Sequence, residues 1–486
     1  MKKLLTLILA SITIGSYAQK VAKPDAYAKT ITAEDLKKHL YVIASPEMEG
    51  RETGTEGQRK AAAYIEAYFK QIGLKPGNGD KYQLYYNIYQ DTLLNAALEV
   101  NGKAYEFDKD FGVGNNVIQA TMKLSEVVVI GSGAKESVNS TDLAGKLVMV
   151  VGTANQAFFG QLAKKGPAAI LLISPNFPRT APSIRRASQS LYAYRKAISP
   201  LQFQISEGVA KTIAGDAYDA AKTTNSLVQT VKADVLLEVK KNSIPAEASD
   251  VLGLLPGTDL KDEYVVISAH YDHLGKRNGV LYPGADDDGS GTVSILELAE
   301  AFTKAAKDGK GPRRSIVFLA NSGEEKGLWG SEYYTDHPVY PLDKTTVDLN
   351  IDMIGRSDPD RKGDTLNYVY VVGDDKLSSD LKTISEAQNK KYTSLDLDYK
   401  YNDPADKERI YFRSDHYNFA RNGVPIIFYY DGMLRPDYHR PTDTPDKINY
   451  SLMQKRAQLV FYTAWEMANR DAMLKRDIPL SAPAVF

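Results

Sequence analysis

The chain has 486 residues, contains no cysteine and carries a formal net charge of −1. This length suffices for two or three domains with a large core. The near-neutral charge gives no electrostatic reason to expect a nucleic-acid partner, and the absence of cysteine excludes disulfides, thiolate metal sites and a cysteine nucleophile.

The N-terminus has the pattern of a secretory signal peptide. Lys2 and Lys3 precede an apolar run over residues 4–14, and Ser16 and Ala18 form a small-residue cleavage site. The sequence therefore predicts an exported protein, periplasmic or secreted from a bacterium, that is cleaved after Ala18. No other stretch is long and apolar enough to span a bilayer.

The next elements are a helix and a region of short strands. Residues 56–74 place apolar side chains at helical spacing and end at Gly73. From residue 123, the runs EVVVIGSG, DLAGKLVMVVG and AAILLIS predict short strands around one helix. The stretch KKNSIPAEASD, residues 240–250, is interpreted as a linker.

From residue 250 onward strands alternate with helices. Helices are expected over residues 290–307 and 450–469, and the apolar runs between them predict strands. Those runs are DVLGLLPG, EYVVISAH, RRSIVFLA, TVDLNIDM, NYVYVVG and GVPIIFYY. The alternation indicates an α/β fold with a mixed, largely parallel sheet flanked by helices. In such sheets ligands bind at the carboxyl ends of the strands.

Histidines and carboxylates gather directly after these strands: His270, Asp272, Asp286, Asp287, Asp288, Glu324, Glu325, Asp352 and His439. Without cysteine, these are the ligand types expected for zinc. Two histidines and three carboxylates are too many for one open tetrahedral site, but they suit two metal ions that share a carboxylate. Of the paired glutamates, one would then bind metal and the other face the water between the ions. Asp272 is placed to orient a ligand histidine.

Each motif alone has a simpler interpretation. Glu324 and Glu325 could form a solvated turn, the DDDGSG run could be a calcium loop or an acidic helix start, and a lone histidine is usually structural. Asp352 lies within an apolar strand, where a carboxylate needs a partner. The succession of all these features after the strands of one sheet favours the metal site.

Several motifs together resemble the co-catalytic zinc aminopeptidase and glutamate carboxypeptidase family. They are SPEMEGRETGTEGQRKAAAYI (45–65), HYD (270–272), GADDDGSG (284–291), SGEEKGLWGSEYY (322–334), NIDMIG (350–355), FRSDHYNFARNGVPIIF (412–428) and YHRPTDT (438–444). The middle of the chain looks like a smaller, mainly β, protease-associated insertion. The resemblance divides the chain into a signal peptide (1–18), an N-terminal part of the peptidase domain (19–118), the insertion (119–245) and the catalytic domain (246–486).

The resemblance also implies a role for each site residue. Asp287 would bridge two zinc ions, with His270 and Asp352 completing one site and Glu325 and His439 the other. Glu324 matches the general base, and Tyr438 matches a tyrosine that steadies the oxyanion. The family often has a cis peptide after the bridging aspartate, here Asp287–Asp288. Cobalt or manganese would suit the same ligands.

The implied activity is removal of N-terminal residues from peptides. A glutamate carboxypeptidase would use the same metals but needs cations for a substrate carboxylate, for which Arg413, Arg421, Arg435 and Arg440 are candidates. A single-zinc glutaminyl cyclase would also carry the HYD stretch, and a non-catalytic receptor ectodomain would share the fold. The sequence leaves open whether His273, Asp415 and His416 contact the ligands, and whether the protein is a monomer or a homodimer.

Overall fold

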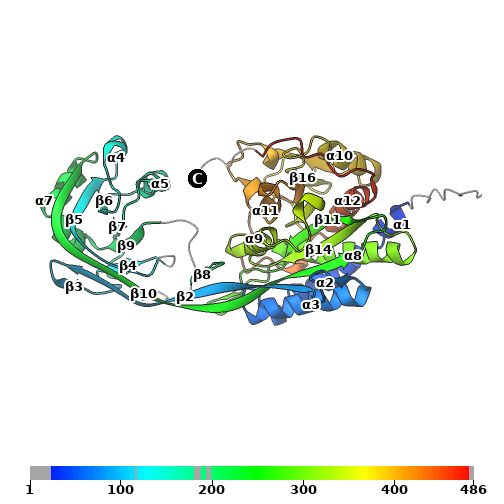
Figure 1. Ribbon diagram of the computed structural model, residues 1–486, viewed down its shortest axis with the longest axis horizontal. Helices are drawn as coiled ribbons and strands as arrows, with labels where there is room; N and C mark the ends of the chain where they lie inside the picture. The colour runs from blue at the N-terminus through cyan, green and yellow to red at the C-terminus, as the bar shows by residue number, and fades with distance from the viewer. Residues whose placement is uncertain (1–22, 115–117, 180–187, 193–198, 481–486) are drawn as a thin grey trace, which may run out of the picture.

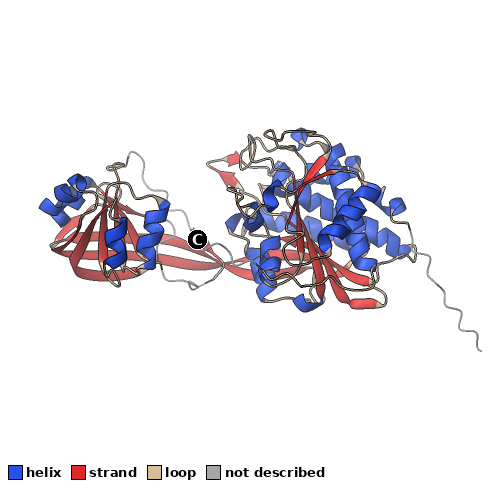
Figure 2. Ribbon diagram, turned by 90° about the horizontal axis from the view of Figure 1, so that it is seen from above, coloured by secondary structure: helices blue, strands red, loops and turns tan. Residues whose placement is uncertain are grey.

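The computed structural model describes residues 23–114, 118–179, 188–192 and 199–480. Two lobes are joined by a long antiparallel ribbon of β2 (Gln83–Val100) and β10 (Val228–Leu255), as Figures 1 and 2 show. The predicted signal peptide lies outside the described residues. Among the described helices, none has the length and apolar character needed to cross a membrane.

The larger lobe contains the strands expected from the apolar runs: β11 (Leu260–His270), β14 (Arg314–Asn321), β15 (Thr345–Ile351), β16 (Tyr368–Val372) and β18 (Ile426–Tyr430). A further edge strand, β17 (Asp396–Asp398), is not predicted by any apolar run. Their order is β17-β16-β18-β15-β11-β14-β10. The four central strands, β18, β15, β11 and β14, are parallel, whereas β16 pairs antiparallel with β18 and parallel with β17, and β10 pairs antiparallel with β14. The predicted mixed, largely parallel α/β sheet is therefore confirmed.

Both faces of this sheet are buried, as a parallel sheet requires. On β11, Val265 and Ile267 pack into one core and Val266 into the opposite one, because successive side chains alternate across the sheet. The first core includes helices α2 (Ala33–Ile43), α3 (Glu56–Ile72), α8 (Gly291–Lys307) and α12 (Tyr450–Asn469). The second includes α9 (Trp329–Asp336) and α11 (His416–Arg421). The helices predicted near residues 56, 290 and 450 are thus confirmed.

The smaller lobe contains four parallel strands, β5 (Ala120–Gly131), β6 (Leu147–Val151), β7 (Ala169–Ile173) and β9 (Leu201–Ile205). They continue the sheet of the larger lobe, because β5 pairs antiparallel with β10. Helices α4 (Lys135–Ser140) and α5 (Gln156–Lys164) cover one face, and α6 (Glu207–Ala214) and α7 (Asp216–Thr223) cover the other. The chain enters this lobe along β2 and leaves it along β10, so both strands belong to both lobes. The predicted domain limits and the protease-associated character stay predictions.

The linker expected over residues 240–250 is wrong. These residues form part of β10 and pair with β2, from Lys241 opposite Leu93 to Asp250 opposite Leu84, after a register shift between Lys240 and Lys241. Here β10 pairs with β2 alone among the described strands, and a proline such as Pro245 is tolerated where a strand has an open edge. Polar residues are tolerated over residues 240–247 because these positions are exposed or only partly buried, whereas Ala248, Ser249 and Asp250 are buried.

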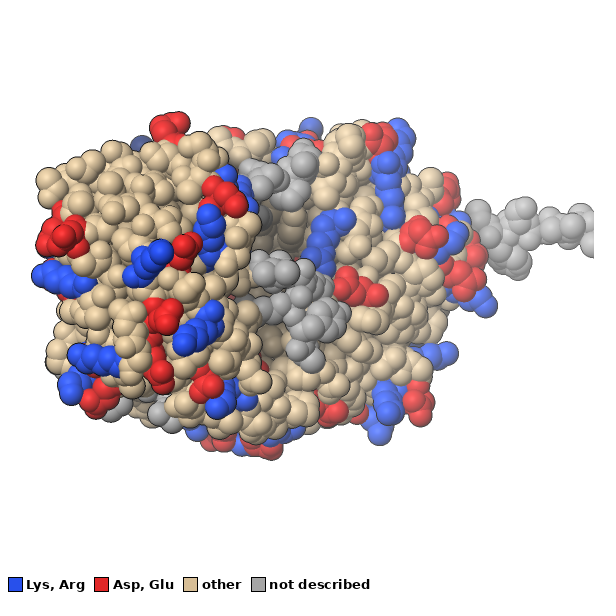
Figure 3. Space-filling view, turned by 60° about the vertical axis from the view of Figure 1, so that its left-hand side comes forward, with Lys and Arg blue, Asp and Glu red and all other residues tan. Residues whose placement is uncertain are grey.

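Charges of both signs are mixed over the surface. In Figure 3, lysine and arginine alternate with aspartate and glutamate on the face shown, and neither sign forms a continuous patch. This distribution agrees with the net charge of −1.

Candidate metal centre

Three neighbouring parallel strands bring the first site residues together. His270 is the last residue of β11, Glu324 and Glu325 follow the end of β14, and Asp352 follows the end of β15. Since β11 pairs with both β14 and β15, the three strand ends lie side by side. The candidate site therefore forms at the carboxyl edge of the sheet, as expected for this architecture.

The three consecutive aspartates before α8 have different surroundings. Asp286 Oδ1 accepts a hydrogen bond from the Gly355 N–H at 2.8 Å, and Asp288 Oδ1 accepts one from the Met353 N–H at 3.0 Å. These contacts tie the loop to the segment after β15. Asp287 between them points toward the histidines, and the Asp287–Asp288 peptide is cis, as the resemblance implied.

The first group of potential ligands surrounds His270. Its Nε2 lies 3.3 Å from Asp287 Oδ1, 3.6 Å from Asp352 Oδ1 and 3.9 Å from Glu324 Oε2. One atom each from His270, Glu324 and Asp352 lie within 4.8 Å of one another. A single ion could contact this group, in which Glu324 lies farthest from His270 Nε2.

The second group surrounds Glu325. His439 Nε2 lies 3.0 Å from Glu325 Oε2 and 3.1 Å from Asp287 Oδ2. His273 Nδ1 lies 2.8 Å from Glu325 Oε1, so this histidine belongs to the centre. Sequence reasoning left the position of His273 open, because the spacing of HYDH in an extended segment does not say which way its ring turns.

Asp287 connects the two groups through its two oxygens. Oδ1 faces His270, while Oδ2 faces His439 and, at 3.8 Å, His273. A carboxylate in this position can bind one cation with each oxygen.

The donor atoms of the centre are chemically suited to metal ions. Among the described residues, four fully buried atoms that face the cluster have no hydrogen-bond partner: His270 Nε2, His273 Nδ1, Asp287 Oδ2 and Glu325 Oε1. Buried polar atoms normally have partners. Imidazole nitrogen and carboxylate oxygen are the donors that zinc accepts when cysteine is absent, so these residues fit a metal centre.

The pKa values of the cluster show how strongly it depends on positive charge. Burial alone would raise the pKa of Asp287, yet contacts with His270 and His439 hold this pKa well below its usual range. Burial disfavours the charged form of His439, but its ion pairs with Asp287 and Glu325 raise its pKa to about 10. The carboxylates therefore require cations beside them, as either protons on histidine or metal ions.

The pKa values of Glu324 and Glu325 are shifted in opposite directions. Burial raises the pKa of Glu324 well above its usual range, and the charges of Asp352 and Glu325 add to the effect. The pKa of Glu325 is lowered, since its contacts with His273 and His439 outweigh burial and repulsion from Asp287. Glu324 is the carboxyl group of the pair with the greater affinity for a proton, which suits proton transfer.

Asp272 supports the first group from behind. Its Oδ1 lies 3.6 Å from His270 Nδ1 and accepts a hydrogen bond from the Glu324 N–H at 3.2 Å. Its Oδ2 accepts a hydrogen bond from Thr53 Oγ1 at 2.6 Å. Asp272 thus lies beside the far nitrogen of His270 and holds the backbone of Glu324.

Two residues at the edge of the site come from distant parts of the chain. Arg51 is fully buried and donates hydrogen bonds to the carbonyls of Tyr271, Pro283 and Gly284, which tie the segments carrying His270 and Asp287 together. Asp443 accepts hydrogen bonds from the N–H groups of Asp286 and Asp287 at 3.0 and 3.1 Å. The motifs SPEMEGRETG and YHRPTDT contain these residues, but their sequences do not reveal these contacts.

Asp415 and His416 lie beside the centre without joining either group. Asp415 accepts a hydrogen bond from Ser331 Oγ at 2.5 Å, and His416 Nε2 lies 2.8 Å from the Tyr411 carbonyl. The His416 ring stacks on Phe428, with ring centroids 4.6 Å apart. These contacts anchor the start of α11.

A pocket opens from the metal centre. Its polar side consists of Asp287, Glu324, Asp352, Arg413 and Tyr438, and its apolar side consists of Met353, Ile410, Phe428, Tyr430 and Leu434. Arg413 Nη2 donates to the Tyr438 hydroxyl at 3.1 Å. The Tyr438 ring stacks on His439, with centroids 3.9 Å apart.

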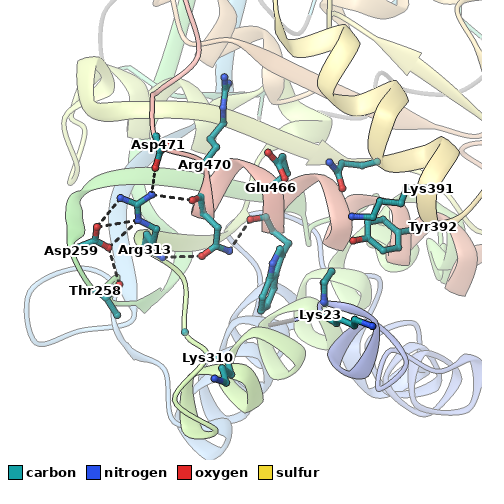
Figure 4. Close-up of a pocket in the computed structure, with 15 residues that line it drawn as sticks. Lys23, Thr258, Asp259, Lys310, Arg313, Lys391, Tyr392, Glu466, Arg470 and Asp471 are labelled. Carbon is teal, nitrogen blue, oxygen red and sulfur yellow. Dashed lines mark hydrogen bonds and ion pairs between the residues drawn. The ribbon is translucent and has the colours of Figure 1, made fainter. Parts of the chain in front are cut away.

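A larger pocket of about 730 Å³ lies at the opposite edge of the sheet. It is lined by Asp259 and Arg313, which directly precede β11 and β14. Arg313 is held between Asp259 and Asp471 at 2.8 and 2.6 Å (Figure 4). As far as the described residues go, this lining contains no histidine, so the larger pocket lacks the ligand set of the carboxyl edge.

Comparison with known proteins identifies the larger lobe. The model of "Peptidase family M28" matches residues 250–464, which contain every residue of the two ligand groups. This match makes residues 250–464 of the chain similar to peptidase family M28. The predicted co-catalytic metallopeptidase family is therefore confirmed.

The chain is similar to a probable leucine aminopeptidase of Arthroderma otae, with 32% identity over 223 residues. The match spans 45% of this chain and 57% of that relative. Among solved structures, the aminopeptidase from Aneurinibacillus sp. strain AM-1 is similar with a TM-score of 0.58 and 19% identity, covering 94% of this chain and 100% of that one. BSAP, a zinc aminopeptidase from Bacillus subtilis, has a TM-score of 0.54 and 20% identity, covering 92% and 99%. At these identities the structures support the fold.

Proposed function

We propose that this protein is an exported di-zinc aminopeptidase that removes N-terminal residues from peptides. The observation that carries the proposal is the position of Asp287, whose two oxygens face two different ligand groups. One ion would be held by His270, Asp287 and Asp352, and the other by Asp287, Glu325 and His439. Bound zinc would supply Lewis acidity and lower the pKa of a water molecule from about 15.7 toward 7.

Glu324 is the proposed general base. Its raised pKa and its position at the edge of the first ligand group suit a carboxylate that takes a proton from water and passes it to the leaving amine. Asp272 positions it through the hydrogen bond from the Glu324 N–H.

Tyr438 is the proposed oxyanion donor. Burial and the nearby charges of Asp287 and Glu324 raise the pKa of Tyr438, so the hydroxyl keeps its proton. That hydroxyl already accepts a hydrogen bond from Arg413, which leaves its own proton free to be donated. A protonated donor in a largely buried pocket stabilises the negative charge that develops on a carbonyl oxygen.

The pocket indicates the substrate class. Carboxylates on one side attract the free ammonium group of a peptide N-terminus, and apolar residues such as Ile410, Phe428 and Leu434 can hold an apolar first side chain. The relative from Arthroderma otae is named as a probable leucine aminopeptidase, which supports the same preference.

A carboxypeptidase is the second candidate, because Arg413 lines the same pocket and could meet a substrate carboxylate. Arg421, another candidate for that role, lies 3.7 and 3.6 Å from Glu332 and Asp336 and is neutralised there. In the metal pocket, Arg413 already donates to Tyr438, which favours the aminopeptidase.

The test is hydrolysis of matched peptides by the zinc-loaded protein. Leu-Ala-Ala should be cleaved at its first peptide bond, and N-acetyl-Leu-Ala-Ala should resist cleavage. Release of glutamate from an N-acetylated peptide ending in glutamate would favour the carboxypeptidase. Cyclisation of an N-terminal glutamine without hydrolysis would favour the cyclase, and no turnover of any substrate would contradict an enzymatic role.

A further inference from the structure

His273 is a buried histidine that the proposed reaction does not use. It follows β11, and its side chain has no exposed surface. Its backbone N–H donates a hydrogen bond to the backbone carbonyl of Arg51 at 3.3 Å. Gly284 packs against the ring so closely that a Cβ there would lie 2.4 Å from the ring Cγ. Gly284 also has a positive φ of 57°, so a side chain at this position would be strained as well as obstructed. The ring is therefore held in place from behind.

The front of the ring faces the second ligand group. Nδ1 lies 2.8 Å from Glu325 Oε1 and 3.8 Å from Asp287 Oδ2. Despite the short distance, neither Nδ1 nor Oε1 has a hydrogen-bond partner among the described residues. A buried nitrogen and a buried carboxylate oxygen in contact without hydrogen-bond alignment are favourable if the histidine is protonated or if a metal ion is beside both.

The two oxygens of Glu325 each face a different histidine. Oε1 is beside His273, and Oε2 is 3.0 Å from His439. The rings of His273 and His439 are 5.9 Å apart at their centroids and are inclined by 70°. His273, Asp287 and Glu325 each offer one atom within 4.8 Å of the others. One ion could thus meet both imidazoles and the Glu325 carboxylate.

We propose that His273 Nδ1 is a ligand of the second metal ion, beside Asp287, Glu325 and His439. The centre is then asymmetric, with two imidazoles at the second position and one, from His270, at the first. Imidazole favours zinc, copper, nickel and cobalt over hard cations such as magnesium. The second position should consequently bind such ions more tightly and keep its ion longer against a chelator.

This inference rests on the proposed function, because it assumes that the centre binds two ions. The experiment uses the full protein, labelled with ¹⁵N at histidine and loaded with two equivalents of ¹¹³Cd²⁺. The chain has six histidines, so the nitrogen resonances can be assigned with single variants. A one-bond coupling between cadmium and nitrogen identifies each ligand directly, which a residue that merely orients another cannot produce.

The variants are His273→Asn and, as a matched control, His39→Asn. His39 is a mostly buried histidine with polar neighbours, Tyr64 and Glu297, and it lies on α2, outside the two ligand groups. The wild type and His39→Asn should show three coupled histidines, and His273→Asn should show two. Chelator competition should show that His273→Asn weakens the tighter site by more than about 100-fold, beyond the range for residues that only orient a ligand.

Two coupled histidines in the wild type would overturn the inference and leave the proposed function intact. Absence of any bound metal in the wild type would instead contradict the proposed function itself. If His273→Asn does not fold, which circular dichroism of the metal-free protein shows, the coupling count of the wild type alone decides the question.

Discussion

Arg413 donates a hydrogen bond to the hydroxyl of Tyr438 across a distance of 3.1 Å. Both side chains line the pocket that opens from the metal centre, and the Tyr438 ring stacks on His439. The contact fixes the orientation of the hydroxyl and assigns its acceptor position to the guanidinium. We therefore expect Arg413 to act through Tyr438 as a positioning residue.

Tyr438→Phe should lower kcat by about 100-fold, the lower end of the effect of removing one oxyanion donor, with little change in KM.

Arg413→Gln should lower kcat by about tenfold, corresponding to the loss of one hydrogen bond from a charged group. In the Tyr438→Phe background, Arg413→Gln should have almost no further effect, because residues that act as a unit are not additive. Independent, additive losses in steady-state kinetics would contradict the positioning role. Arg421→Gln is the matched control and should retain full activity.

The adjacent glutamates should respond differently to the same substitution. Glu324→Gln should lower kcat by at least about 10²-fold, as expected for loss of a general base, while two zinc ions remain bound. Glu325→Gln should lose zinc, since Glu325 contacts both histidines of the second group. Metal analysis alongside kinetics distinguishes the two effects. Full activity in Glu324→Gln, or full zinc content in Glu325→Gln, would show that the roles are wrongly assigned.

The apolar side of the pocket should control the choice of the first residue. Leu434→Trp fills part of this space, so it should lower kcat/KM for a leucine substrate relative to an alanine substrate by about 10-fold or more, the usual scale for a change in an apolar pocket. Leu366→Trp is the control, because Leu366 is 67% exposed and is not among the residues that line the pocket. An unchanged leucine-to-alanine ratio in Leu434→Trp would place the side-chain pocket elsewhere.

The buried carboxyl group of Asp374 should make the folding stability of the protein depend on pH. It is fully buried, neither carboxylate oxygen has a hydrogen-bond partner among the described residues, and burial with the nearby charge of Asp375 raises its pKa to about 7. The unfolded chain releases this proton near pH 4. Between these values the unfolded state binds fewer protons than the folded state, so stability falls as pH rises from about 4 to 7 and is then constant.

Asp374→Asn should remove this loss, which is at most about 4 kcal/mol for a shift of about 3 pKa units. Thermal unfolding at pH 5 and pH 8 measures it: the variant should gain Tm over the wild type mainly at pH 8. Asp262→Asn, at an exposed position of β11, should show no such difference. An equal change of Tm at both pH values in Asp374→Asn would contradict the buried, protonated carboxyl group.

The sequence predicts the parts of the molecule in which local pattern and tertiary packing agree. The β11, β14, β15 and β18 strands are apolar runs because both faces of the sheet are buried, and the same burial makes Asp352 conspicuous. The rule that ligands bind at the carboxyl edge then brings residues from three strand ends to one place.

Other features depend on contacts that no local pattern records. Residues 240–250 form a strand because β2, which lies far earlier in the chain, pairs with them, although their polar composition resembles a loop. The direction of the His273 ring is set by Gly284 and Arg51, which lie elsewhere in the chain. The tie between Arg413 and Tyr438 likewise joins two loops whose sequences give no sign of their contact.

The zinc content of the purified protein, measured for the wild type and for Asp287→Asn, tests most directly whether Asp287 bridges two metal ions. We expect two zinc ions per chain in the wild type and a substantial loss from both positions in the variant, because each oxygen of Asp287 faces one ligand group. One zinc ion per chain in the wild type, or two retained by Asp287→Asn, would contradict a centre of two ions bridged by this aspartate.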